Sequence, residues 1–75
     1  MRNFFSIKDL AIETGVSYHT VYYYIRKGLI KEVGIMGEDQ RVFDEACLKK
    51  LRRIVTLRAE GKRIEKILEI LGKEV

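Results

Sequence analysis

The chain has 75 residues, 47% of them apolar, and its 15 lysines and arginines against 11 aspartates and glutamates leave a net charge of +4. A chain this short holds one modest core, its apolar content excludes a disordered tail, and its single cysteine excludes an internal disulfide. It contains no apolar run near the roughly 20 residues that span a bilayer and no secretory signal, so we expect a soluble, cytoplasmic domain whose charge favours anionic partners.

The first predicted element is a helix over residues 7–14. Ser6, followed three residues later by Asp9, is typical of a capping box, and apolar residues then repeat at helical spacing. Gly15 stands where the end of a helix favours a left-handed residue. Because Ser17 can accept hydrogen bonds from the first amides of a second helix, we expect the chain to turn sharply here and start again.

The second predicted helix covers about residues 18–27 and ends at Gly28. A rotation of about 100° per residue divides it into two faces. The inner face carries Val21, Tyr24 and Ile25. The outer face carries His19, Tyr22, Tyr23 and Arg26. Two short helices joined by a glycine-containing turn, with aromatic, imidazole and guanidinium groups facing outward, indicate a helix-turn-helix.

A β-hairpin is expected next. Residues 29–33 are β-branched and alternating enough for a strand, residues 34–39 hold two glycines for a turn, and residues 40–43 can form the returning strand. This hairpin would form a wing beside the helix-turn-helix.

Two further helices follow the hairpin. Asp44 can cap the third helix, and Gly61 can end it. The periodic stripe of the third helix consists of Leu48, Leu51, Ile54, Val55 and Arg58. The fourth helix is marked by Ile64, Ile67, Leu68 and Leu71.

The predicted organisation is a single domain over residues 1–75, because no linker, internal repeat or low-complexity segment interrupts it. Its fold class is mainly α with a small β-hairpin wing, a winged helix-turn-helix with four helices. The helix-turn-helix spans residues 6–28, the wing residues 29–43 and the supporting helices residues 44–72.

The stretch FSIKDLAIETGVSYHTVYYYIRKGLI resembles the opening of the N-terminal DNA-binding domain of the MerR family of transcription regulators. The matching positions are Ile7, Ala11, Gly15, Val16, Thr20, Tyr23, Tyr24, Gly28 and Leu29. Residues 41–44, Arg-Val-Phe-Asp, resemble the element that closes the family's wing. The resemblance implies a recognition helix in the major groove, a wing on neighbouring phosphates, and a long C-terminal helix that pairs two subunits.

The chain departs from the family pattern in four places. Tyr22 stands where the family usually has a DNA-contacting arginine, the proline soon after Gly28 and Leu29 is missing, and the wing tip GIMGEDQ carries two acids while Phe43 replaces a tyrosine. In the fourth departure, the chain stops at Val75, about where the family's dimerisation helix and effector domain would begin. We therefore carry over no inducer pocket or metal sensor, and we expect a homodimer only if a longer parent chain supplies that helix.

The expected DNA contacts lie on the front and outer face of the second helix and on the wing. They are Ser17, His19, Thr20, Tyr22, Tyr23, Arg26, Lys31 and Arg41. Hydroxyls, rings and guanidinium groups can reach phosphates and base edges. The plainer alternatives are a solvated helix face, and for Arg41 an ion pair with Glu38 or Asp39. For the basic run Lys49, Lys50, Arg52 and Arg53 we favour solvated margins of a buried stripe.

Catalysis and metal binding find no support in the sequence. It contains no phosphate-binding glycine loop with a lysine, no paired acids with a defined cleft and no nucleophile with a base. His19 lacks the partner ligands that a metal requires, and Cys47 beside an apolar stripe most often fills space. We expect no enzyme activity, no catalytic residues, no metal and no cofactor.

The predicted function is sequence-specific binding of double-stranded DNA, regulating transcription, in the cytoplasm with the nucleoid and away from the membrane. An alternative keeps the DNA and changes the process, to a targeting module of a transposase, excisionase or chromosome-anchoring protein. A second alternative is a protein-interaction domain that uses Tyr22 and Tyr23 as aromatic anchors.

Overall fold

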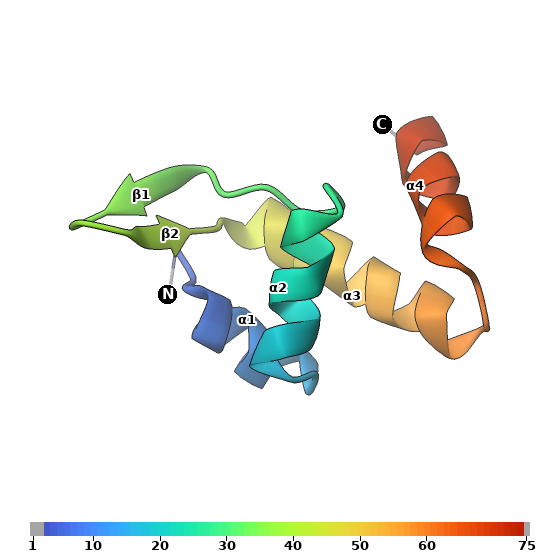
Figure 1. The fold of residues 1–75 in the computed structure, drawn as a ribbon, viewed down its shortest axis with the longest axis horizontal. Coiled ribbons are helices and arrows are strands. Elements are labelled where there is room, and N and C mark those ends of the chain that lie inside the picture. Colours follow the sequence, from blue (N-terminus) through green and yellow to red (C-terminus); the bar gives the residue numbers. More distant parts are fainter. Residues whose placement is uncertain (1–2, 75) are drawn as a thin grey trace.

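The computed structural model describes residues 3–74, so positions 1–2 and 75 of the predicted domain lie outside the described residues. Within 3–74 the elements are α1 (Ile7–Thr14), α2 (Tyr18–Arg26), β1 (Gly34–Met36), β2 (Gln40–Val42), α3 (Glu45–Ala59) and α4 (Ile64–Lys73). Helix α3 runs along the middle of the molecule, with the hairpin at one end and α4 at the other (Figure 1). The predicted fold class, four helices with a small hairpin, is confirmed.

Both ends of α1 form as the sequence predicts. The Ser6 hydroxyl accepts from the Asp9 amide at 3.0 Å, and the Asp9 carboxylate accepts from the Ser6 amide at 3.0 Å. At the other end of α1, Gly15 adopts a φ of 75° and its amide donates to the Ala11 carbonyl. Because glycine carries no Cβ, it reaches this left-handed conformation without strain, and α2 can start three residues later in a new direction.

The hairpin starts later than predicted, so the assignment of a strand to residues 29–33 is wrong. The first strand is Gly34–Met36, which pairs antiparallel with Gln40–Val42 in the register Gly34↔Val42, Ile35↔Arg41 and Met36↔Gln40. Leu29 and Ile30 are each only 2% exposed and belong to the core. These two apolar residues resemble a strand in sequence, but burial against the helices outweighs local strand propensity.

The base of the hairpin is tied to the N-terminal segment. Phe5 and Phe43 form an antiparallel bridge, each amide donating to the other residue's carbonyl at 2.8 Å. Both rings are buried in the core. Phe43, predicted as the last residue of the returning strand, therefore anchors the wing to the helical body.

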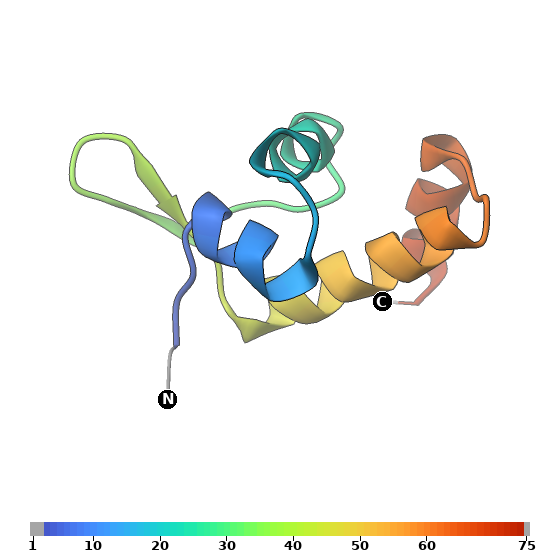
Figure 2. The same cartoon turned by 90° about the horizontal axis from the view of Figure 1, so that it is seen from below.

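One core unites all the helices and the base of the wing. The buried residues are Phe5, Leu10, Val21, Tyr24, Leu29, Ile30, Phe43, Leu48, Leu51, Ile54, Leu57, Ile67 and Leu71. Figure 2 shows α3 passing along one side of α1 and α2, where its apolar stripe closes this core.

The inward stripes of α3 and α4 differ at three positions from the predicted ones. On α3 the stripe continues to Leu57, whereas Arg58 is exposed and donates to the Lys62 carbonyl at 2.8 Å. On α4 Ile67 and Leu71 are buried, and Leu68 faces solvent. In each helix the pattern in sequence allowed two neighbouring stripes, and the direction of packing decided between them.

We predict that Leu10→Ala lowers the free energy of unfolding by about 2 to 5 kcal/mol, because the Leu10 side chain is completely buried. Ile12 lies on the same helix but is 67% exposed, so Ile12→Ala should change that free energy by less than about 0.5 kcal/mol. Urea denaturation followed by circular dichroism measures both. Equal losses in the two variants would contradict the packing of α1.

We also predict an acid-dependent cap on α3. The hydrogen bond from the Cys47 amide lowers the pKa of the Asp44 carboxyl. The carboxylate therefore stabilises the fold fully above its unfolded pKa, near about 4, and this contribution is lost as the pH falls through the lower folded pKa. Asp44→Asn keeps an N-cap acceptor that does not ionise, so its free energy of unfolding should depend less on pH.

Denaturation of both proteins at neutral pH and at roughly pH 3 tests this cap. Asp44→Ala, which has no cap acceptor, should be less stable than wild type already at neutral pH. An Asp44→Asn protein with the full acid dependence of wild type would overturn the assignment.

Candidate nucleic-acid interface

Helix α2 exposes the side chains that the sequence places on its outer face. These are His19, Tyr22, Tyr23 and Arg26. Val21 and Tyr24 are buried, and Ile25 is half-buried and packs against the core. The predicted division of α2 into an inner and an outer face is thus confirmed. That the outer face contacts DNA stays a prediction.

Ser17 and Thr20 form the N-terminal cap of α2. The Ser17 hydroxyl accepts from the Thr20 amide at 3.1 Å, and the two hydroxyl oxygens lie 2.8 Å apart in a second hydrogen bond. Ser17 remains exposed and Thr20 half-exposed. Both hydroxyls therefore have a structural partner, and the start of the helix is already ordered before any ligand arrives.

A cationic side chain lies near the ring of each of the two adjacent tyrosines on the outer face. The Lys27 ammonium lies 5.6 Å from the centroid of the Tyr23 ring, and the Arg41 guanidinium lies 5.7 Å from that of Tyr22. Cations within about 6 Å of a ring are attracted by its quadrupole. The outer face of α2 thus combines flat apolar surface with positive charge, which suits a polyanion that also presents bases.

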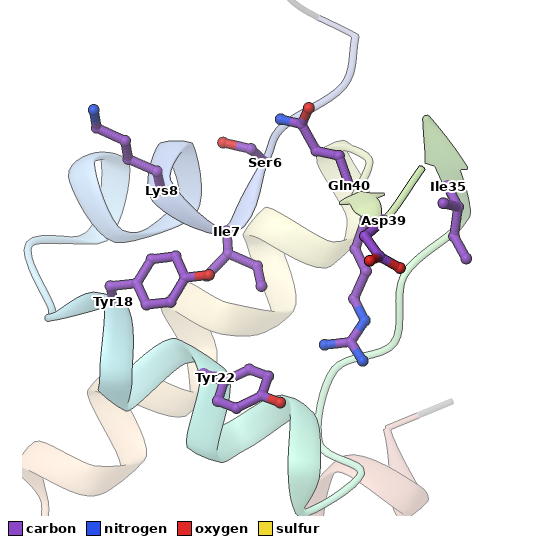
Figure 3. Close-up of a pocket in the computed structure, with 9 residues that line it drawn as sticks. Ser6, Ile7, Lys8, Tyr18, Tyr22, Ile35, Asp39 and Gln40 are labelled. Atoms are coloured by element: carbon purple, nitrogen blue, oxygen red, sulfur yellow. The ribbon is translucent and has the colours of Figure 1, made fainter. Parts of the chain in front are cut away.

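An open groove of about 560 Å³ lies between α2, the start of α1 and the wing. It is lined by Ser6, Ile7, Lys8, Tyr18, Tyr22, Ile35, Asp39, Gln40 and Arg41. Figure 3 shows Lys8 and Tyr18 on one side of this groove and Asp39 and Gln40 on the other. Sequence reasoning missed Lys8, Tyr18 and Ile35, although a lysine in the first turn of the first helix was a signal for a cation near the site.

A second groove, of about 320 Å³, lies on the other side of α2. His19, Thr20, Tyr23, Tyr24, Arg58 and Ile64 line it. Arg58 comes from the last turn of α3, and its bond to the Lys62 carbonyl holds the guanidinium at the turn into α4. Sequence reasoning missed this residue because it placed Arg58 in the buried stripe.

Arg41 and Lys31, the two predicted contacts outside the helix-turn-helix, occupy different surroundings. Arg41 pairs with Glu32, Nε to Oε1 at 3.6 Å, and not with Glu38 or Asp39 as the plainer alternative suggested. Lys31 is exposed and lines neither groove described above. Of the two, the structure brings only Arg41 next to α2.

The basic run on α3 is partly engaged in surface ion pairs. Arg52 pairs with Glu13 at 3.6 Å, and Arg53 pairs with Glu74 at 2.9 Å. The Glu74 carboxylate raises the pKa of the Arg53 guanidinium. These contacts agree with solvated margins of a buried stripe, as the sequence favoured.

The described residues offer no metal site, since no three His, Cys, Asp or Glu side chains among them gather closely enough. Burial raises the pKa of the Cys47 thiol, and its Sγ donates to the Lys31 carbonyl at 3.4 Å. A protonated, hydrogen-bonded thiol is a poor nucleophile. Over the part of the chain that is described, the helices are also too short or too polar to span a membrane.

Comparison with known proteins gives one family and several solved structures. The family described as MerR HTH family regulatory protein matches residues 5–74. No curated relative matches the chain.

Three solved structures share the fold. A transcriptional regulator of the MerR family from Bacillus cereus has a TM-score of 0.84 at 20% identity over 91% of this chain and 51% of its own. HiNmlR, a MerR family regulator lacking the sensor domain and bound to promoter DNA, has a TM-score of 0.80 at 24% identity, over 89% of this chain and 51% of its own. The HTH-type transcriptional regulator SkgA from Caulobacter crescentus has a TM-score of 0.76 at 25% identity, over 89% of this chain and 48% of its own. The chain thus spans about half the length of each.

We predict that the Ser17 hydroxyl stabilises the fold as a helix cap. Ser17→Ala removes the acceptor for the Thr20 amide and should lower the free energy of unfolding by about 0.5 to 2 kcal/mol. Ser17→Asp keeps a good cap and should restore most of that loss in chemical denaturation. If Ser17→Ala is as stable as wild type, the cap has no energetic role.

Proposed function

Because the chain belongs to the MerR HTH family of regulatory proteins, we propose that it binds double-stranded DNA with sequence specificity and regulates transcription. The observation that carries the proposal is the position of α2, whose exposed face lies between two grooves that each contain cationic side chains. The promoter DNA bound by the similar HiNmlR supports duplex DNA as the ligand.

The proposed binding mode places α2 in the major groove. Lys8 and Arg41 line the groove on the wing side, and Arg58 lines the one on the side of α4. In this mode these cations bind the phosphates on either side of the major groove and fix the position of the protein, while α2 contacts the base edges.

Direct readout of guanine then depends on Arg26. It is the exposed guanidinium on α2, and arginine donates two hydrogen bonds to O6 and N7 of guanine. At the position where the family usually has an arginine, this chain has Tyr22. His19 and Tyr23 complete the face toward the bases. Ser17 and Thr20 lie at the N-terminal end of α2, and a helix N-terminus favours a phosphate.

Several further properties belong to the same proposal. The domain acts in the cytoplasm on nucleoid DNA, carries out no chemical reaction, and forms a homodimer where a longer parent chain supplies a dimerisation helix. One module of this size gains affinity from a second half-site, so such a dimer would prefer a palindrome. The same contacts would serve a DNA-targeting module of a recombination protein, and the regulatory role is favoured here by the family.

The test is fluorescence anisotropy of labelled duplexes, first of mixed sequence and then of sequences selected from a random pool, at several salt concentrations. The logarithm of the binding constant should fall against the logarithm of the salt concentration with a slope of about −0.9 for each phosphate neutralised. Selected duplexes should bind more tightly than mixed ones. A protein without measurable affinity for any duplex in dilute buffer would refute the function.

Two variants test the face of α2. Arg26→Ala and Tyr23→Ala should weaken binding to a selected duplex by roughly tenfold or more, with little change in the free energy of unfolding, because both side chains are exposed. Lys49→Ala is the matched control, since Lys49 lies in a separate hollow between α3 and α4. If Lys49→Ala binds as weakly as Arg26→Ala while Tyr23→Ala binds as wild type does, charge alone, and not this face, determines binding.

A further inference from the structure

Tyr22 and Arg41 form the contact that joins α2 to the wing. We propose that Tyr22 is a positioning residue, whose ring, together with the Glu32 carboxylate, holds the Arg41 guanidinium in the groove where it binds a DNA phosphate. Tyr22 then acts on DNA chiefly through Arg41. This inference rests on the proposed function, and it gives a role to the aromatic ring that stands where the family usually has an arginine.

The guanidinium of Arg41 is held from two sides. Its central carbon lies 5.7 Å from the centroid of the Tyr22 ring, and its Nε lies 3.6 Å from Glu32 Oε1. The Arg41 side chain is 38% exposed and that of Glu32 26%, so water screens the ion pair only in part. A ring and a carboxylate together restrict a long side chain that would otherwise sample many rotamers.

The unused donors of Arg41 remain available for a ligand. A guanidinium carries five N–H donors, and within residues 3–74 the ion pair engages the Nε edge. The two Nη groups are therefore left for an acceptor in the groove, in the fork geometry that fits two oxygens of one phosphate.

The wing needs such a contact because it is small. Each of its strands has three residues, and an isolated hairpin of two strands is at best marginally stable in water. The bridge between Phe5 and Phe43 fixes its base. Beyond that base, among the described residues 34–42 of the hairpin, only Arg41 makes an ion pair or a ring contact with the rest of the protein.

Electrostatics on the wing make the position of Arg41 matter more. Asp39 lines the same groove, and Glu38 precedes it in the turn, so the tip of the hairpin repels phosphates. A single guanidinium beside these acids gains most when it is held toward α2, away from the tip. Tyr22 supplies that restraint from the helix, and Glu32 supplies it from the segment that leads into β1.

The experiment is a double-mutant cycle on duplex affinity and its salt dependence, with a duplex that the wild type binds. Arg41→Gln should weaken binding by about tenfold and make the salt slope shallower by about 0.9, the equivalent of one phosphate. Tyr22→Ala and Tyr22→Leu should produce the same two changes although they remove no charge. The double variant Tyr22→Ala with Arg41→Gln should be no weaker than Arg41→Gln alone.

Two controls separate positioning from other roles. Tyr22→Phe keeps the ring and should bind as wild type does, with an unchanged slope. Lys49→Gln removes the same charge outside both grooves beside α2 and should leave the slope unchanged. Denaturation should show all variants folded, because Tyr22 and Lys49 are exposed and the Arg41 side chain is 38% exposed.

Each alternative result overturns the inference in a recognisable way. Additive losses in the cycle, or a Tyr22→Ala variant that binds more weakly but with the wild-type slope, would mean that Tyr22 contacts the DNA by itself, and the proposed function would stand. A Tyr22→Ala variant with both the affinity and the slope of wild type would mean that Tyr22 has no role in binding. A Tyr22→Phe variant as weak as Tyr22→Ala would assign the effect to the hydroxyl. A wild-type protein that binds no duplex would refute the proposed function, and this inference with it.

Discussion

The burial of one side of α2 is the constraint on which the rest of the structure depends. Val21 and Tyr24 are buried and Ile25 packs against them at the core, so the opposite side of the helix has to face outward. The left-handed Gly15 makes this possible, because it lets α2 start in a new direction after a turn of three residues. The exposed face that we assign to DNA is thus a direct consequence of hydrophobic packing.

Two grooves, each lined by an arginine, border the exposed face of α2. The wing brings Arg41 to one side of the helix and the end of α3 brings Arg58 to the other, although both residues are distant from α2 in the chain. The hydroxyls of Ser17 and Thr20 order the start of the helix through each other. In the proposed mode of binding, this end of α2 then needs little rearrangement, which reduces the entropy lost when the complex forms.

The departures from the family pattern are concentrated on the side of the wing. An aromatic ring replaces an arginine at Tyr22, and two acids occupy the hairpin tip. The structure relates the first change to Arg41, since the ring that lacks a charge of its own lies against a residue that has one. On this side the charge beside the ring is contributed by Arg41 of β2.

The sequence alone determined α1, α2 and their caps, the two faces of α2, the four-helix fold with a hairpin, and the family. These features depend on local signals, namely hydrogen-bonding side chains at helix ends, a glycine in the turn and a helical period of apolar residues. Only the tertiary structure decided that Leu29 and Ile30 enter the core instead of a strand, that Leu57 and not Arg58 turns inward, and that Arg41 meets Tyr22 and Glu32. The physical reason is that burial and contacts between distant segments depend on how the elements pack, and a short apolar or charged stretch is compatible with more than one packing.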